Sequence, residues 1–125
     1  MGDPYDLARF VTAQDAGGTY RWALVELRAG RKTGHWMWFV FPQIAGLGQS
    51  ETSRRYAIAS RAEAAAYLQH VLLGPRLIEC TRIVDATRAG SATEIFGPVD
   101  AKKLQSCMTL FRRAAPGEQI GRAHV

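Results

Sequence analysis

The feature that most constrains the fold of this chain is a run of six apolar residues, WMWFVF, at positions 36–41. Because apolar and polar positions do not alternate within it, the run has to be buried on every side, whether it forms a helix or a strand. Pro42 follows directly, and a proline disfavours helical geometry at the residue before it. With no partner strand visible elsewhere, we expect a short helix that ends at Pro42 and leads into an irregular, glycine-containing loop.

Helix signals precede this run. Asp3 followed by Pro4 favours a helix start, and apolar residues at positions 7, 10 and 11 then share one helical face. Glycines at positions 17 and 18 interrupt this helix, and a second helix with the same apolar spacing ends at Gly30. The two segments predict a helical hairpin.

Helix signals also follow the run. Ser60 with Glu63 forms a capping box, and Asp100 is expected to cap the last helix after a single-turn helix that ends at Gly97. Two apolar stripes at helical spacing predict core-facing helices, namely Leu77, Cys80, Thr81 and Val84, then Leu104, Cys107, Met108 and Phe111. We therefore expect an all-α fold, a small single-domain bundle of short helices with one buried aromatic segment.

The composition is that of one globular domain. A chain of 125 residues with 47% hydrophobic and 22% charged residues can bury one core, and we expect residues 1–119 to form a single helical domain. Cys80 and Cys107 lack the spacing of a metal site or a disulfide framework, so we expect reduced thiols in a cytoplasmic protein and no bound metal. No signal pattern and no apolar run of membrane-spanning length is present, so we expect no membrane partner.

The formal net charge of +5 does not by itself indicate a nucleic-acid-binding protein. Lys and Arg occur as separated pairs along the chain rather than as a tract or a stripe. This scatter is typical of a solvated surface, and it does not favour nucleic acid as the partner.

The polar residues at the start of the apolar run form the first half of a candidate site. His35 is the candidate catalytic residue, because an imidazole next to cationic and aromatic residues can act as a general acid or base near neutral pH. Trp36 and Trp38 could stack on a base or a nicotinamide ring while Lys32 holds a phosphate. The same tryptophans could instead belong to the core, and a buried indole N–H needs a polar acceptor in either case.

The segment after Pro42 forms the second half of the candidate site. Its glycines allow backbone N–H groups to approach an anion, and its polar side chains add further donors. The pattern GLGQS lacks the full glycine signature of a phosphate-binding loop. The candidate ligand-binding residues here are Gln43, Gly46, Gly48, Ser50, Arg55 and Tyr56.

The last six residues, IGRAHV, fit nothing in the sequence before them. They are what the start of a common sequencing adapter encodes when it is read in frame. We expect residues 120–125 to be a non-native, adapter-derived tail, and the native sequence to be truncated after Gln119.

Several segments together resemble a known family: ELRAGRKTGHWMWFVFPQIAGLGQS at 26–50, RRYAIAS at 54–60 and LGPRLIECT at 73–81. The chain to Gln119 is similar to an uncharacterised, mainly bacterial domain family of unknown function, sometimes mislabelled calpastatin. The resemblance implies a small, mostly helical cytoplasmic domain whose members continue with a further C-terminal helical stretch. It implies no established activity, cofactor or partner.

Two functions remain open from the sequence. The first is binding, with or without enzymatic processing, of an anionic nucleotide or ADP-ribose-like small molecule by the residues on either side of the aromatic run. The alternative is a non-catalytic module for interaction with protein or nucleic acid, in which HWMWFVFPQ is purely structural. Exposure of His35 and of the two indole rings distinguishes these functions.

Overall fold

The computed structural model describes residues 2–87 and 91–114, so the tail expected at 120–125 lies outside the described residues. Within these ranges the structure has no strand, and an isolated parallel bridge joins Ile44 to Ile58. The all-α fold is confirmed. The elements are α1 (Ala8–Asp15), a 3-10 turn (Ala16–Gly18), α2 (Thr19–Arg28), α3 (Met37–Val40), α4 (Glu51–Arg55), α5 (Arg61–Gln69), α6 (Leu73–Ala86) and α7 (Ala92–Ala114).

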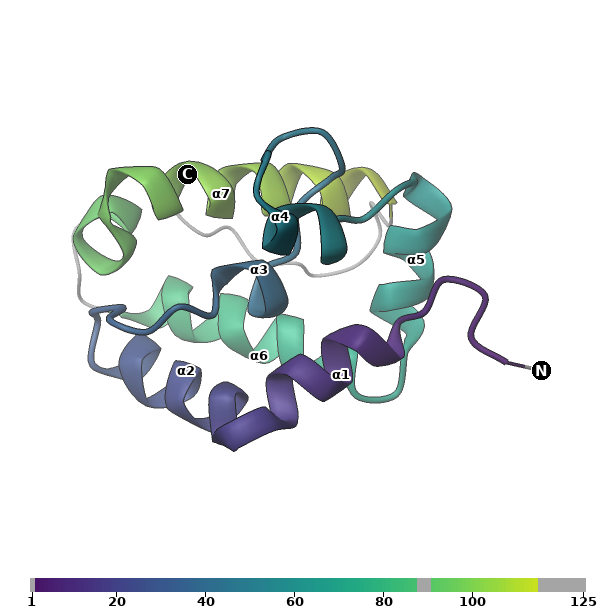
Figure 1. Ribbon diagram of the computed structural model, residues 1–125. Coiled ribbons are helices and arrows are strands. Elements are labelled where there is room, and N and C mark those ends of the chain that lie inside the picture. The colour runs from purple at the N-terminus through teal and green to yellow at the C-terminus, as the bar shows by residue number, and fades with distance from the viewer. Residues whose placement is uncertain (1, 88–90, 115–125) are drawn as a thin grey trace.

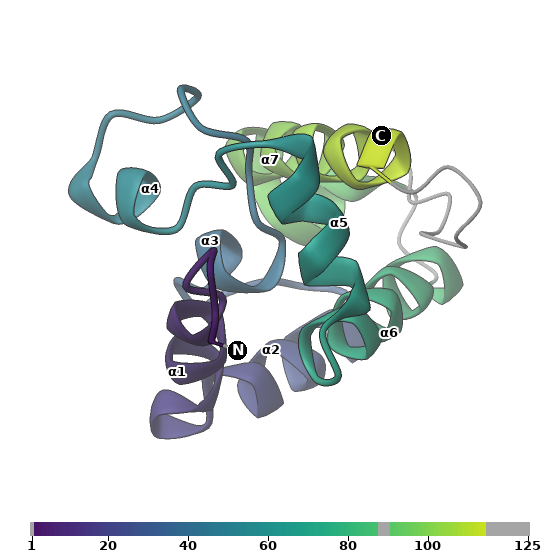
Figure 2. The same ribbon diagram turned by 90° about the vertical axis from the view of Figure 1, so that its right-hand side faces the viewer.

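The helices surround the short helix α3. In Figure 1, α7 runs along one side of the molecule, the α1–α2 hairpin lies on the opposite side, and α6 lies between them. Helix α5 contacts both α6 and α7, and α1 contacts α3. Figure 2 shows that α4 and the loop before it project to one side of this assembly. The loop and α4 therefore lie on the outer side of the molecule, next to the aromatic segment.

The aromatic segment is largely part of the core, as its sequence predicts. Positions 36, 37, 40 and 41 are buried, whereas Trp38 and Phe39 are half-buried. The rings of Trp36, Phe41 and Phe96 contact one another, with centroids 5.9 to 6.4 Å apart. Every residue of the two predicted apolar stripes is buried as well. Burial of large apolar side chains is the main source of stability for such a fold.

Side-chain bonds support the starts of two helices, one where the sequence predicts it and one displaced. Helix α1 begins at Ala8 rather than at Pro4, because Asp3 caps a preceding turn: its carboxylate accepts the backbone N–H groups of Leu7 and Ala8 at 2.8 and 2.7 Å. The hydroxyl of Ser60 accepts the N–H of Glu63 at 3.0 Å, and the Glu63 carboxylate accepts the N–H of Ala59 at 2.9 Å. These bonds satisfy N–H groups that have no partner inside a helix.

The start of the last helix differs from the prediction. Gly97 leaves helical geometry, with φ 80° and ψ 165°, so a break occurs where one is expected. Asp100, however, does not cap the helix that follows. Its carboxylate accepts the ammonium groups of Lys32 and Lys103, at 2.7 and 3.0 Å. The expectation was wrong because Lys32 is remote in sequence and its position beside α7 is set by tertiary packing.

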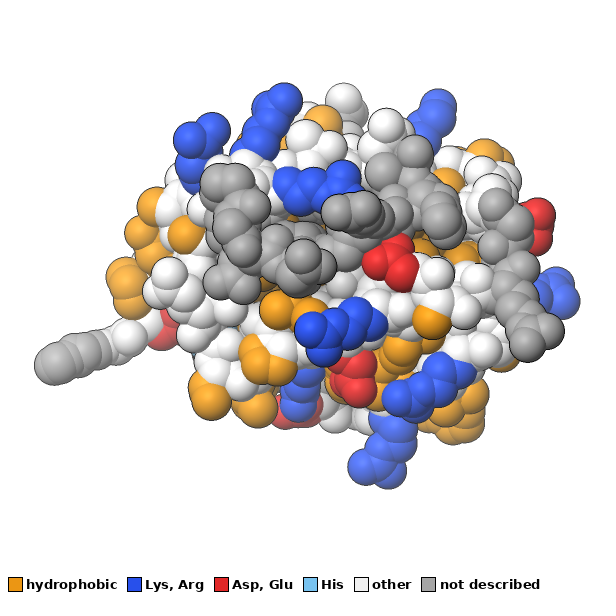
Figure 3. Space-filling model, turned by 180° about the vertical axis from the view of Figure 1, so that it is seen from behind, with side chains coloured by type: hydrophobic (Ala, Val, Ile, Leu, Met, Phe, Trp, Pro, Cys, Tyr) orange, Lys and Arg blue, Asp and Glu red, His pale blue; other side chains and the backbone are white. Residues whose placement is uncertain are grey.

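The charged surface agrees with the scatter of basic residues in the sequence. Figure 3 shows Lys and Arg side chains spread over one face of the molecule, with apolar and acidic side chains between them. The face in view shows no continuous basic stripe of the kind that is typical of nucleic-acid-binding domains. In the part of the chain that the structure describes, no helix combines the length and the apolar character needed to cross a membrane.

Candidate functional site

Trp36 is anchored in the core by Glu26. The indole N–H donates to Oε1 of Glu26 at 3.0 Å, and the same oxygen accepts the backbone N–H groups of Thr33 and Gly34 at 2.7 and 2.8 Å. Desolvation of the Glu26 carboxylate opposes its ionisation, but these donors outweigh desolvation and hold the pKa of Glu26 below its ordinary value. Trp36 is only 2% exposed, so its ring is not available to stack on a ligand.

Three charged residues, Lys32, Asp100 and Lys103, form a charged cluster beside the two tryptophans. The Asp100 carboxylate binds both ammonium groups, and each ammonium also lies near an indole ring, Lys32 at 5.2 Å from the Trp36 centroid and Lys103 at 4.6 Å from that of Trp38. Burial raises the pKa of Asp100, yet the two ammonium groups outweigh this effect and lower it. Both lysines of the cluster therefore have their partners inside the protein.

Gln43 fixes the loop after Pro42 to α7. Its side chain is buried, and Nε2 donates to the carbonyl oxygens of Phe41 and Lys103 at 2.8 and 2.7 Å. Its backbone carbonyl accepts the N–H of Ile58 at 2.8 Å. The amide donors predicted to bind a ligand are thus bonded within the fold, and they hold residues 44–48 beside α7.

The glycines and Ser50 shape this loop in different ways. A Cβ on Gly48 would lie 2.6 Å from the side chain of Ser53 and 2.9 Å from the ring of Trp38, so Gly48 allows α4 to pack against the indole. The Ser50 hydroxyl accepts the N–H of Ser53 at 3.0 Å and caps α4. Gly46 has a positive φ of 96° with open space around it. Among these three residues, Gly46 retains a backbone that a ligand can approach.

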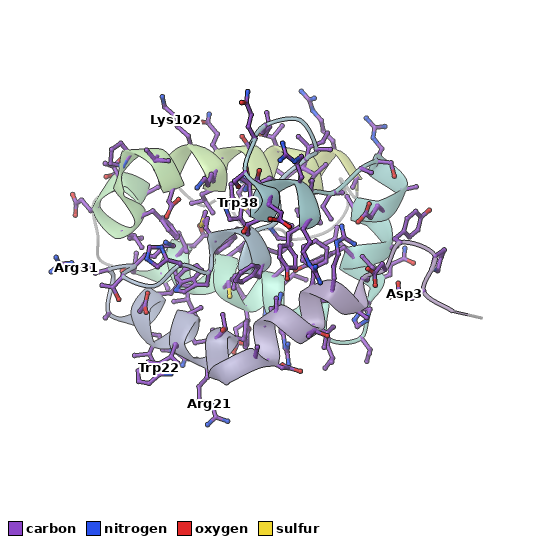
Figure 4. All side chains as sticks on the ribbon, viewed as in Figure 1. Asp3, Arg21, Trp22, Arg31, Trp38 and Lys102 are labelled. Atoms are coloured by element: carbon purple, nitrogen blue, oxygen red, sulfur yellow. The ribbon has the colours of Figure 1, made fainter. Side chains whose placement is uncertain are left out.

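Of the other predicted residues, Tyr56 is half-buried, with its ring against those of Phe39 and Phe10, whereas two are accessible. His35 and Arg55 are exposed, and the Arg55 guanidinium lies 5.7 Å from the ring centroid of Tyr56. No hydrogen bond, ion pair or ring contact within the described ranges joins His35 or Arg55 to the charged cluster. Figure 4 shows Trp38 lying under α4 near the centre of the molecule. The structure therefore brings Lys32, Trp36, Trp38 and Gln43 together around α7, and leaves His35 and Arg55 outside that assembly.

A groove of about 630 Å³ opens where the loop held by Gln43 meets α7 and the first residue of α5. We call it the cationic groove, because three of its lining side chains are Arg61, Lys102 and Arg113. None of the three forms an ion pair with a described residue, and none of the groove's described lining residues is a carboxylate. Lys102 extends from the outer edge of α7, away from Trp38 (Figure 4).

The rest of the groove combines apolar and hydroxyl groups. Ile44 and Leu47 of the loop are 41% and 57% exposed, and Leu110 of α7 lies opposite them in the lining. Ser106 and Thr109 add hydroxyl groups on α7 between the two cations of that helix. A lining of this kind matches a ligand that has both an anionic and an apolar part.

The groove is not apparent from the sequence. The candidate residues predicted from the sequence lie between Lys32 and Tyr56, and from that segment only residues 44 and 47, neither of them a predicted site residue, are among the described lining residues. The available signal was the recurrence of polar residues at 102, 106, 109 and 113, on the helical face opposite the apolar stripe. That spacing predicts an exposed face of the helix, but it does not show that a loop some sixty residues earlier lies over it.

Comparisons with known proteins agree with the resemblance seen in the sequence. Residues 4–125 match the family described as "Protein of unknown function (DUF1810)". A crystal structure of the conserved hypothetical protein Rv1873 from Mycobacterium tuberculosis is similar to this chain, with 59% sequence identity and a TM-score of 0.89. That alignment covers 94% of this chain and 83% of the mycobacterial one. No curated protein matches the chain.

Proposed function

This chain belongs to the DUF1810 family, whose function is unknown, and we propose that it binds an anionic small molecule in the cationic groove. The observation that carries the proposal is the lining of the groove, in which three cationic side chains have no ion-pair partner among the described residues and no described lining residue is a carboxylate. Cations placed in one concave surface without a counter-charge favour an anionic ligand. The chain would act there as a binding protein.

The size and apolar part of the groove support a small molecule of nucleotide-like dimensions. Its volume of about 630 Å³ falls within the range of roughly 300–1,000 Å³ that is usual for ligand pockets. Ile44, Leu47 and Leu110 offer an apolar surface to a base or an alkyl chain, and the arginines suit phosphate or carboxylate groups through paired N–H donors.

A second candidate keeps the nucleotide-like ligand at the aromatic segment, where the sequence predicts it. Its support is that His35 and Arg55 are exposed and Trp38 is half-buried, so these groups are open to solvent. In this candidate His35 acts as the acid or base, and Arg55 with the amides around Gly46 holds the phosphate. The internal bonds of Lys32, Trp36 and Gln43 weaken this candidate, because these three members of the residue set predicted from the sequence could join the site only by leaving partners inside the fold.

We further infer that the protein works in the cytoplasm. The support is chemical: Cys80 and Cys107 are both buried free thiols, a state that suits a reducing compartment.

A thermal-shift experiment on the full chain tests the two candidates together. The probes are inorganic phosphate, ADP, ADP-ribose and NAD, each with the wild type and with the variants Arg113→Gln, Arg55→Gln and Arg21→Gln. We expect at least one organic anion to raise the melting temperature, and Arg113→Gln alone to weaken this shift. Arg21 is a matched control because it is an exposed arginine of α2, on the far side of the molecule from α7 (Figure 4).

The other outcomes are equally informative. A shift that is lost in Arg55→Gln and kept in Arg113→Gln supports the second candidate and contradicts the groove. If none of the four anions changes the melting temperature, both candidates fail, and the interaction-module function becomes the better account.

A further inference from the structure

The charges of the cationic groove are arranged at separate places along α7. Lys102 and Arg113 line the same groove from one helix. They stand about three helical turns apart, or roughly 16 Å along the axis at 1.5 Å per residue. This is the separation of the two backbone positions, so one compact anionic group contacts both cations only if both long side chains lie along the helix toward each other. Where the side chains extend away from the helix, a ligand that binds both needs an extended body.

The surface between the two cations is uncharged. Ser106 and Thr109 lie on the same helical stripe as Lys102 and Arg113, because positions three and four apart share a face. Leu110 and the loop residues Ile44 and Leu47 border this stripe. The middle of the groove therefore offers hydroxyl groups and apolar surface, and the charges are at its ends.

The third cation makes the two ends unequal. Arg61 is the first residue of α5, and α5 begins beside the C-terminal part of α7, as both ribbon views show (Figures 1 and 2). Helices α5 and α7 are in contact. Because Arg61 lines the groove and its helix begins near the C-terminal part of α7, we assign its guanidinium to the Arg113 end, which leaves the ammonium of Lys102 as the single cation of the other end.

Resting on the proposed function, we infer that the ligand of the cationic groove is an elongated dianion. One anionic group, phosphate or carboxylate, lies at the Arg61 and Arg113 end, where guanidinium groups can bind it through paired N–H donors. The second anionic group lies at Lys102, and an apolar middle packs on Leu110, Ile44 and Leu47. Binding includes no covalent step.

Linear dicarboxylates of graded length are suitable probes, because each consists of two anionic ends joined by an apolar chain. We expect isothermal titration calorimetry on the full chain to show affinity rising from butanedioate through octanedioate to dodecanedioate. The longest dicarboxylate should bind about tenfold more tightly than dodecanoate, the monocarboxylate of the same length, since a second charge-assisted contact forms. An analogue of dodecanedioate in which a phosphate replaces one carboxylate should bind more tightly than dodecanedioate, because the phosphate carries more charge at the arginine end of the groove.

Matched variants locate the two charges. Lys102→Gln should reduce dodecanedioate binding about tenfold, to the level of dodecanoate, and should leave dodecanoate binding nearly unchanged. Arg113→Gln should weaken both ligands, and Arg21→Gln should weaken neither. All three side chains are exposed, so the fold is expected to persist, and the melting temperature of each variant verifies it.

The results separate this inference from the proposed function. Equal binding of the mono- and dicarboxylate, with sensitivity to Arg113→Gln alone, overturns the two-ended ligand and leaves an anion site in the groove. Binding that is insensitive to both groove variants places the probes elsewhere and overturns both. No binding of any probe, together with an ADP or NAD shift that Arg113→Gln removes, rejects the elongated dianion and retains the proposed function.

Discussion

Lys102 and Lys103 are neighbours on α7, yet they belong to two regions of opposite character. Lys103 lies in the charged cluster, bonded to Asp100 and placed over the ring of Trp38. Lys102 is exposed in the cationic groove and has no partner among the described residues. One region is bonded internally and the other is open. In this chain, the aromatic segment that looks most like a site in the sequence has its polar groups bonded within the fold. The cations without a described partner lie instead on the exposed face of an ordinary amphipathic helix and at the start of another.

The largest loss of stability is expected at another internally bonded charge pair, that of Arg9 with Glu63, which lies outside the charged cluster. The Arg9 guanidinium donates to Glu63 at 2.9 Å and to four backbone carbonyl oxygens, and the two side chains are only 12% and 5% exposed. Arg9→Met leaves the Glu63 carboxylate buried without its partner. We expect a loss of about 3–5 kcal/mol in the free energy of unfolding. Urea unfolding followed by tryptophan fluorescence measures it.

Arg21→Met is the matched control for this prediction, because it makes the same change at an exposed arginine. Its free energy of unfolding should stay within about 0.5 kcal/mol of the wild type. If Arg9→Met and Arg21→Met have equal, small effects, an internally bonded charge contributes no more to the free energy of unfolding than an open one, and the comparison fails.

A smaller effect is expected at Glu26, which holds Trp36. Glu26→Gln keeps an oxygen acceptor but removes the charge that strengthens three hydrogen bonds, so we expect a loss of roughly 1–2 kcal/mol at neutral pH. The pKa of Glu26 is lowered in the folded protein. Its stabilising contribution is therefore complete above the ordinary pKa of a glutamate, and it is lost as the pH falls through the folded value.

Urea unfolding at about pH 6 and at about pH 3 measures this dependence on pH. These two pH values lie on either side of the ordinary carboxyl pKa. The wild type should lose stability on acidification, and Glu26→Gln should lose less. Asp100→Asn is the comparison variant, because in the wild type Lys32 and Lys103 also lower the pKa of the Asp100 carboxyl group. An identical acid sensitivity of wild type and Glu26→Gln would show that Glu26 does not contribute to it.

The fold was predictable where local signals decide it. The capping bond at Ser60, the break at Gly97 and the burial of the stripe from Leu77 to Val84 follow from spacing and side-chain chemistry within one or two helical turns. Asp100 was not predictable, because its partner Lys32 comes from a distant part of the chain. The same holds for Arg9 and Glu63, which are 54 residues apart. Such pairs depend on how the helices pack, which no local pattern encodes.

The site was less predictable than the fold for the same physical reason. His35, Trp36 and Trp38 are adjacent in sequence, but burial separates them, since Trp36 is enclosed and His35 is exposed. The sequence does predict that a buried indole N–H needs an acceptor, and Glu26 supplies it. It cannot predict that Gln43 ties the loop to α7 and thereby places Ile44 and Leu47 over a helix face.

The smallest expected effects on the free energy of unfolding are those of the two neighbouring lysines, Lys102 and Lys103, and they differ between the two. Lys103→Gln removes a partly buried ion pair and a cation–π contact, so we expect a loss of about 1 kcal/mol in the free energy of unfolding. Lys102→Gln removes an exposed charge without a described partner and should change stability by less than about 0.5 kcal/mol. Urea unfolding of the two variants, prepared side by side, measures both changes.

The same two variants should exchange their order when ligand binding is measured. Lys102 lines the cationic groove and Lys103 does not, so Lys102→Gln should weaken the dodecanedioate interaction about tenfold while Lys103→Gln leaves it nearly unchanged. Lys103→Gln would then lose stability but keep its affinity, and Lys102→Gln would lose affinity but keep its stability. Such a result requires two separate roles for these adjacent residues. If Lys103→Gln weakens binding as much as Lys102→Gln, the charged cluster and the groove act as one site, and the division between a bonded and an open region has to be abandoned.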